Sequence, residues 1–242
     1  MAIIKNPKEI FPQITDDYQK VFGDDLVSII LYGSAAGTDY VPGKSDINFL
    51  IVLSDTAIDH LHRTFETVSR WKKKNVATPL FMTESYIGSS LDSFPLEFLN
   101  IKINYILVFG KDVLEHIEFE MHHLRLQCER ELKGKLLLLR EGFLETEGKS
   151  KKIKELITAS ITAFISIFTG LLYLKGIDMP HSRRAVLETV TDTINIDHTV
   201  FTQCLDVKEG KGNFSASELM ALFQAYLREV RRLWEIVDTF DI

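Results

Sequence analysis

The sequence predicts an α+β protein, with a mixed sheet and helices in its first half and an all-helical bundle in its second. Two observations carry this expectation. Short apolar runs alternate with helical patterns up to residue 113, whereas from residue 114 the apolar residues recur every three or four positions. We therefore expect two domains, residues 1–113 and residues 114–242. A chain of 242 residues that is 45% hydrophobic can bury a core in each.

The first half is predicted to form two helices and five short strands. Apolar, β-branched runs bounded by Gly or Pro favour strands, and apolar residues spaced three or four apart favour helices. The helices are expected at 8–22 and 56–74, and the strands at 26–32, 46–53, 79–82, 95–101 and 105–110. The order of the strands in the sheet does not follow from these patterns.

The second half is predicted to form four or five long helices. One apolar stripe runs from Ile117 through Leu132 to Phe143, and another follows the last segment from Leu219 to Phe240. Ser215 and Glu218 form a capping-box pattern before that last helix. Further helices are expected at 150–175 and 183–194, with the loop 145–152 joining the first two.

The run 156–174 carries no charge over 19 residues, close to the roughly 20 that span a bilayer. Five Ser and Thr residues interrupt it, however, and no aromatic belt flanks it. A helix that is apolar most of the way round is also what the centre of a bundle requires. We expect a buried bundle helix, and no association with a membrane.

Net charge and cysteine content indicate which partners the protein can bind and in which cellular compartment it occurs. The net charge of −6 provides no overall basic field for a phosphate backbone, so general nucleic-acid binding is not expected. Cys128 and Cys204 are far apart and lack the spacing of a zinc site or a disulfide framework. The first residues show no secretory signal. These features together predict a cytoplasmic protein with reduced thiols.

The segment 31–53 contains the residues most typical of a ligand-binding or catalytic site. A strand runs into Gly33 and Ser34 and then into small residues, which is typical of a tight turn that a phosphate can approach closely. Twelve residues after Ser34, Asp46 opens the next strand. Because side chains alternate along a strand, Asp46 and Asn48 are expected on one face.

This pattern resembles the nucleotidyltransferase superfamily, in which Gly-Ser is followed after about ten residues by Asp-x-Asp on the next strand. The layout, with a helical bundle after the sheet, is similar to that of bacterial aminoglycoside adenylyltransferases. The resemblance implies a phosphate-binding turn at Gly33 and Ser34, and metal ligands at Asp46 and Asn48. It also implies ATP and Mg²⁺, because clustered carboxylates hold the divalent cations that bind a triphosphate.

The sequence departs from that pattern in two places. Asn48 stands where the family has a second aspartate, and an amide oxygen brings no negative charge. The run 79–82, where the third carboxylate is expected, contains no acid. Glu97, an acid in an apolar run, is the better candidate for a third ligand or catalytic base, ahead of Glu84. The alternative for Glu97 is a half-exposed position or a pairing with Lys102.

Two functions follow from these residues. In the first, the protein transfers AMP from ATP to a hydroxyl of a small molecule or protein, with Asp46 as principal metal ligand and Glu97 as third ligand or base. In the second, the protein is a catalytically impaired pseudoenzyme. It then serves as a nucleotide-binding or protein-interaction module, and its helical half associates with a partner or with a second copy. The identity of the acceptor does not follow from the sequence.

Overall fold

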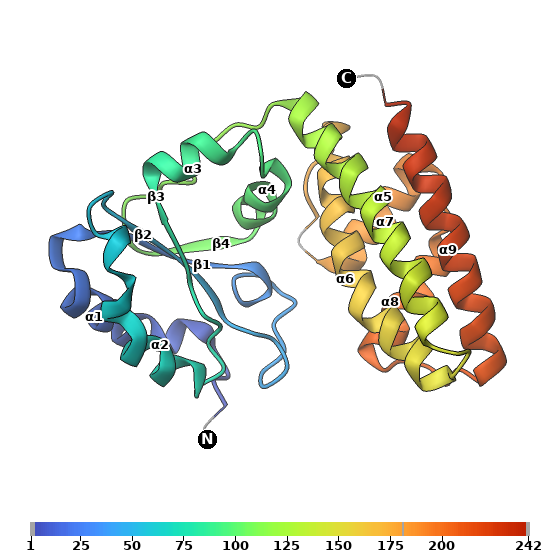
Figure 1. Cartoon of the computed structure of the whole chain (residues 1–242), viewed down its shortest axis with the longest axis horizontal. Coiled ribbons are helices and arrows are strands. Elements are labelled where there is room, and N and C mark those ends of the chain that lie inside the picture. The colour runs from blue at the N-terminus through green and yellow to red at the C-terminus, as the bar shows by residue number, and fades with distance from the viewer. Residues whose placement is uncertain (1–2, 181, 241–242) are drawn as a thin grey trace. The chain divides into compact units, whose positions relative to one another are not determined.

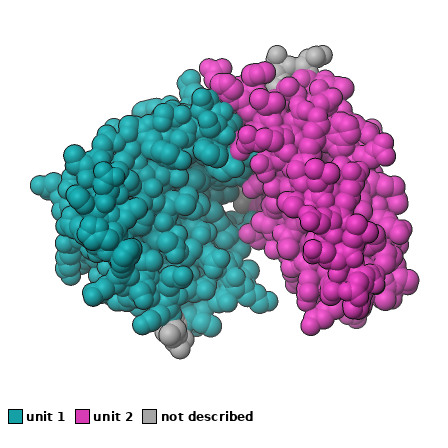
Figure 2. Space-filling view, in the orientation of Figure 1, with its two compact units in different colours: residues 1–119 teal, residues 120–242 magenta. Residues whose placement is uncertain are grey.

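The computed structural model describes residues 3–180 and 182–240 of the chain. The chain divides into two compact units, residues 1–119 and residues 120–242. Figure 2 shows the two units in different colours. The first contains a sheet with helices on both faces, and the second contains only helices in its described part. This arrangement confirms the predicted α+β class.

The sheet of the first unit has four strands in the order β3-β2-β1-β4. Its members are β1 (Leu26–Tyr32), β2 (Asn48–Leu53), β3 (Leu80–Thr83) and β4 (Tyr105–Gly110). β1 is antiparallel to both β2 and β4, whereas β2 is parallel to β3, so the sheet is mixed. The two central strands are the most apolar, as expected for strands that are covered on both faces.

One face of the sheet packs against α1 (Phe11–Phe22) and α2 (Phe65–Lys72). Tyr18 of α1 and Trp71 of α2 are almost fully buried in this core. Asp17 fixes the two helices to each other, because it accepts a hydrogen bond from Trp71 Nε1 at 3.0 Å and pairs with Arg70 at 2.7 Å. The segment expected as one helix at 56–74 is a 3-10 helix, Ile58–Thr64, followed by α2.

The other face of the sheet lies toward α3 (Glu84–Ser90) and α4 (Pro95–Ile103), as Figure 1 shows. The prediction of a strand at 95–101 was therefore wrong. Pro95 occupies the first turn of α4, where its fixed φ suits a helix and its missing N–H costs nothing. The side chains of Leu96, Phe98 and Leu99 are all buried. The apolar residues of this segment therefore follow neither the two-residue period of a strand nor the 3.6-residue period of a helix.

The second unit is a bundle of five helices within the described residues. These are α5 (Met121–Glu145), α6 (Ser150–Leu174), α7 (Arg183–Ile194), α8 (His198–Glu209) and α9 (Ala216–Asp238). The helices expected at 150–175 and 183–194 are confirmed, and so is the capping box of Ser215 and Glu218. The first bundle helix begins at Met121, so Ile117 precedes it and is not part of its stripe.

α6 is the central helix of the bundle, and it contacts α5, α7, α8 and α9. Its length and apolar composition would suffice to cross a membrane, and 56% of its most apolar window is buried inside the protein. The Thr169 hydroxyl donates to the Ile165 carbonyl one turn back, at 3.1 Å. The uncharged run thus forms a packed bundle helix, as the sequence predicted.

Candidate functional site

A tight turn closes the end of β1, at the residues expected to receive a phosphate. After Tyr32 the chain forms a short 3-10 helix, Gly33–Ala35. Gly33 has a φ of +74°, a left-handed backbone that residues with a side chain rarely adopt. Its N–H donates to the carbonyl of Asn104 at 3.0 Å, and the N–H of Gly37 donates to the Ser34 carbonyl at 3.3 Å. The turn is therefore fixed by its own backbone and by the chain before β4.

Asn48 lies beside this turn. It is the first residue of β2 and pairs with Tyr32, the last residue of β1. A Cβ placed on Gly33 would lie 3.6 Å from Asn48 Nδ2, so the amide packs directly against the glycine. Throughout residues 3–180 and 182–240, neither the Ser34 hydroxyl nor the Asn48 amide has a hydrogen-bond partner. Both groups are thus free to bind a ligand.

Asp46 lies two residues before the start of β2 and is exposed. The alternation expected for this segment is present, because Ile47 and Phe49 are fully buried in the core between the sheet and α1. The Ile47 backbone is held by hydrogen bonds with Asn75 and Ala77. The structure thus brings Gly33, Ser34 and Asn48 to one end of the sheet, with the Asp46 carboxylate two residues before Asn48.

Asn104 is a further residue of this site, and no local pattern in the sequence indicates it. Besides receiving the Gly33 N–H, its side-chain Oδ1 lies 3.2 Å from the position of a Cβ on Gly37. Its side-chain amide has no hydrogen bond to any residue that the structure describes. Only the pairing of β1 with β4 brings Asn104 to the turn, and that pairing joins segments some seventy residues apart.

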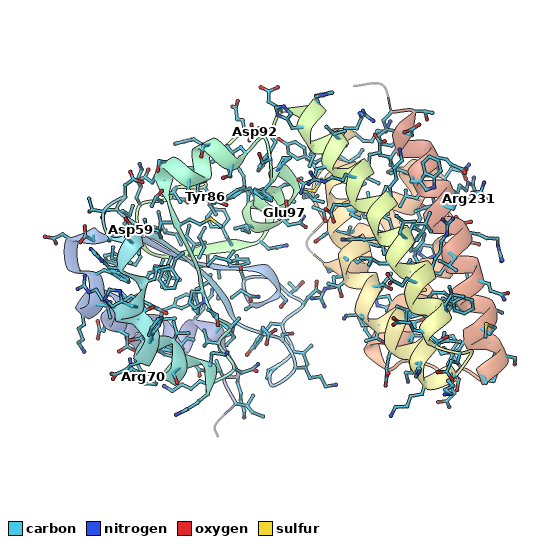
Figure 3. All side chains as sticks on the ribbon, in the orientation of Figure 1. Asp59, Arg70, Tyr86, Asp92, Glu97 and Arg231 are labelled. Atoms are coloured by element: carbon cyan, nitrogen blue, oxygen red, sulfur yellow. The ribbon has the colours of Figure 1, made fainter. Side chains whose placement is uncertain are left out.

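The acidic residues do not form a cluster for two metal ions. Among the described residues no group of three His, Cys, Asp or Glu could hold a metal. β3 carries no acid, and Glu84 forms an ion pair with Lys111. Glu97 is exposed in the first turn of α4 (Figure 3), so the reason for choosing it, an acid within an apolar strand, no longer holds. Its catalytic role stays a prediction.

The donor set of Asp46 and Asn48 fits one magnesium ion better than two. Mg²⁺ keeps several waters and needs only one or two protein oxygens besides those of a phosphate. One carboxylate and one amide oxygen can meet that need. A two-metal centre holds cations about 4 Å apart and requires more negative charge than these two residues supply.

Two tyrosines extend the polar row at this end of the sheet. Tyr32 pairs with Asn48 on one side and with Tyr105 on the other. Burial raises the pKa of Tyr32. Burial and a 2.9 Å hydrogen bond to Asp112 raise the pKa of Tyr105 to about 12. Both phenols are therefore neutral near pH 7.

Comparison with known proteins shows that the chain resembles a solved structure in its fold. No protein-family model matches the sequence, and no curated protein matches it. Among solved structures, the chain is similar to the spectinomycin adenyltransferase AAD(9) from Enterococcus faecialis, solved with ATP and spectinomycin. The match has a TM-score of 0.55 at 10% sequence identity.

The chain is thus similar in fold to a solved adenyltransferase. The match covers 94% of this chain and 99% of AAD(9), so it includes the sheet-containing unit and the helical bundle. At 10% identity it concerns the fold and not the site residues. It confirms the predicted architecture, a mixed sheet with helices followed by a helical region.

Proposed function

We propose that this protein belongs to the nucleotidyltransferase superfamily and transfers AMP from ATP to a hydroxyl of a small molecule or protein. The observation that carries the proposal is the gathering of three unpaired polar side chains, Ser34, Asn48 and Asn104, around the left-handed Gly33 turn. Such unpaired groups at a turn of small residues suit a phosphate. The adenyltransferase fold, known from a structure with ATP, supports the same assignment.

Phosphate binding here relies on side chains more than on the backbone. The Gly33 N–H is already bonded to the Asn104 carbonyl, and the Gly37 N–H to the Ser34 carbonyl. The Ser34 hydroxyl and the amide N–H₂ groups of Asn48 and Asn104 are the donors that remain. We infer that these three residues bind the triphosphate and that Gly33 allows its close approach.

In the proposed reaction, the acceptor oxygen attacks the α-phosphorus of ATP in line with the departing pyrophosphate. A bond forms between the acceptor oxygen and phosphorus, the bond to the bridging oxygen breaks, and the hydroxyl proton passes to a carboxylate or to solvent. Asp46 and Asn48 would hold a magnesium ion, which offsets the negative charge of the triphosphate. With one carboxylate in the set, we expect slow transfer.

Calorimetry with ATP, with and without Mg²⁺, tests binding. We expect ATP to bind, and Ser34→Ala to weaken binding about tenfold, as for the loss of one charge-assisted hydrogen bond of roughly 1.5 kcal/mol. Ser89→Ala is the matched control, because Ser89 is an exposed serine on α3 that donates to its own helix. Absence of ATP binding in both conditions would overturn the proposal.

Transfer is tested separately, by following label from α-phosphate-labelled ATP into hydroxyl acceptors, including amino sugars and proteins. Labelled acceptor that disappears with Asp46→Asn supports adenylyl transfer. Binding that is retained without any transfer identifies the protein as a catalytically impaired nucleotide-binding module.

A further inference from the structure

The outer face of α5 exposes four leucines. Leu126, Leu137, Leu138 and Leu144 are 50%, 64%, 64% and 78% exposed. The opposite face of the helix, which includes Leu132, is buried where α5 packs against α6 and α9. Surface leucines that occur singly need no explanation, but a row of them on one helix marks an interaction surface.

Three of these leucines lie on one line. An α-helix turns about 100° per residue, so Leu126, Leu137 and Leu144 point within roughly 20° of one another. At about 1.5 Å per residue, the line from Leu126 to Leu144 is roughly 27 Å long. We call this line, with the residues beside it, the α5 stripe. It spans most of the helix.

We propose that the α5 stripe binds the α5 stripe of a second copy, antiparallel and about a two-fold axis. In such a pair, each residue faces the one that lies equally far on the other side of the axis. Leu126 and Leu144 have their midpoint at Lys135. An axis through this point therefore brings leucine against leucine at both ends of the contact.

The charges beside the stripe fit an axis at nearly the same place. Arg130 and Glu141 have their midpoint between Lys135 and Leu136, half a residue from the midpoint of the two outer leucines, and both lie on the same side of the line of leucines. Both are exposed, and neither forms an ion pair with any described residue of its own chain. In the antiparallel pair each Arg130 meets the Glu141 of the other copy, which gives two ion pairs. A parallel pair would instead leave Arg130 and Glu141 of the two copies 11 residues apart along the helix, about 16 Å.

A glycine on α5 also fits the proposed antiparallel pair. Gly134 and Leu137 also lie on either side of the same midpoint, so each Leu137 faces the Gly134 of the other copy. A Cβ on Gly134 would meet no atom within 4 Å, and the helix surface there is open. A large side chain thus faces a gap, which allows the two helices to approach closely.

Charge reversal tests the proposal on the full-length protein, with self-association measured by sedimentation. Arg130→Glu or Glu141→Arg alone replaces two attractions with two repulsions, and we expect each to weaken dimerisation about tenfold. The double variant restores the opposite charges and should restore dimerisation. Arg231→Glu on α9 (Figure 3) is the matched control, because Arg231 pairs with Glu235 within its own helix. Circular dichroism confirms that each variant is folded.

Cysteine cross-linking tests the direction of the helices. Protein with Leu126→Cys, mixed with protein that carries Leu144→Cys, should form a disulfide-linked dimer on oxidation. Either variant alone should form far less. The native Cys128 and Cys204 are buried and do not interfere. A monomeric protein at concentrations of about 100 µM, a double charge variant that does not recover, or cross-linking of Leu126→Cys with itself would each overturn the proposal.

Discussion

Replacing either of two glycines that have a left-handed backbone by alanine should destabilise the protein, and we expect the loss of stability to differ between them. Gly33 has a φ of +74° and Gly110 a φ of +79°. A Cβ on Gly33 would have ordinary contacts, so Gly33→Ala should cost only the backbone strain, about 1–2 kcal/mol. A Cβ on Gly110 would lie 2.0 Å from the Val27 carbonyl oxygen, so Gly110→Ala must also displace a strand and should cost more.

Tryptophan fluorescence during urea unfolding measures this difference. Trp71 is buried in the first unit, and a Trp234→Phe background removes the only other tryptophan of the chain. Equal losses for the two alanine variants would show that strain alone governs both positions.

At Asn48, restoring a carboxylate is expected to change ATP binding in opposite directions with and without metal. With Mg²⁺, Asn48→Asp should strengthen binding about tenfold, because a carboxylate attracts a divalent cation more strongly than an amide does. Without Mg²⁺, the same variant should weaken binding about threefold, since it adds repulsion against the triphosphate. Calorimetry under both conditions measures the two effects.

Asp46→Asn is the matched control and should produce the reverse pair of changes. If Asn48→Asp leaves both titrations unchanged, the end of β2 is not a metal and phosphate site. The pseudoenzyme without nucleotide would then replace the proposed function.

The site residues differ in how far the sequence could predict them. Gly33, Ser34 and Asn48 lie on consecutive strands and in a short turn, where local pattern suffices to place them near one another. Asn104 reaches the turn only through the pairing of β1 with β4, and strand order is not encoded in local periodicity. Residues that join a site through distant pairing carry no signal of their own.

Among the elements, α4 shows where reasoning from periodicity fails. Five of the seven residues at 95–101 are buried and apolar, at adjacent and alternate positions, so neither a period of two nor one of 3.6 dominates. Pro95 is the first residue of the run, and a proline there suits the first turn of a helix as well as the start of a strand. By contrast, α9 alternates steps of four and three over its whole length and was predicted correctly.

The contact between α7 and α8 should depend on pH. Arg184 of α7 pairs with Asp206 and Glu209 of α8, at 2.6 Å each. Burial acts to raise the pKa of Glu209, but hydrogen bonds from Arg184 and Lys211 outweigh it, so the pKa lies below the ordinary 4.5. A carboxyl with a lowered pKa stabilises the fold above the unfolded value, and this stability is lost as the pH falls through the folded value.

Arg184→Gln should therefore destabilise the protein by about 1 kcal/mol at pH 7, a modest value because these groups are partly exposed. The difference from wild type should shrink as the pH falls below about 4.5. Urea unfolding followed by circular dichroism at several pH values measures it. A difference that stays constant down to about pH 3 would assign the loss to packing of the arginine stem.

At the scale of the whole molecule, we expect the protein to be recovered without detergent. α6 is apolar enough to cross a membrane, yet its contacts with the four other bundle helices bury more than half of its most apolar window. Fractionation of cells that express the native chain measures this directly. Recovery only in detergent would show that the bundle opens and that α6 enters the lipid.

The position of α6 in the chain also has a consequence for synthesis. Three of its four neighbours, α7, α8 and α9, follow it in the sequence, and α9 ends only at Asp238. At roughly 5–20 residues per second, the ribosome needs several seconds to add them. During that interval the most apolar helix of the molecule has only α5 to pack against. The nascent chain, rather than the finished protein, is therefore the form that most needs a chaperone.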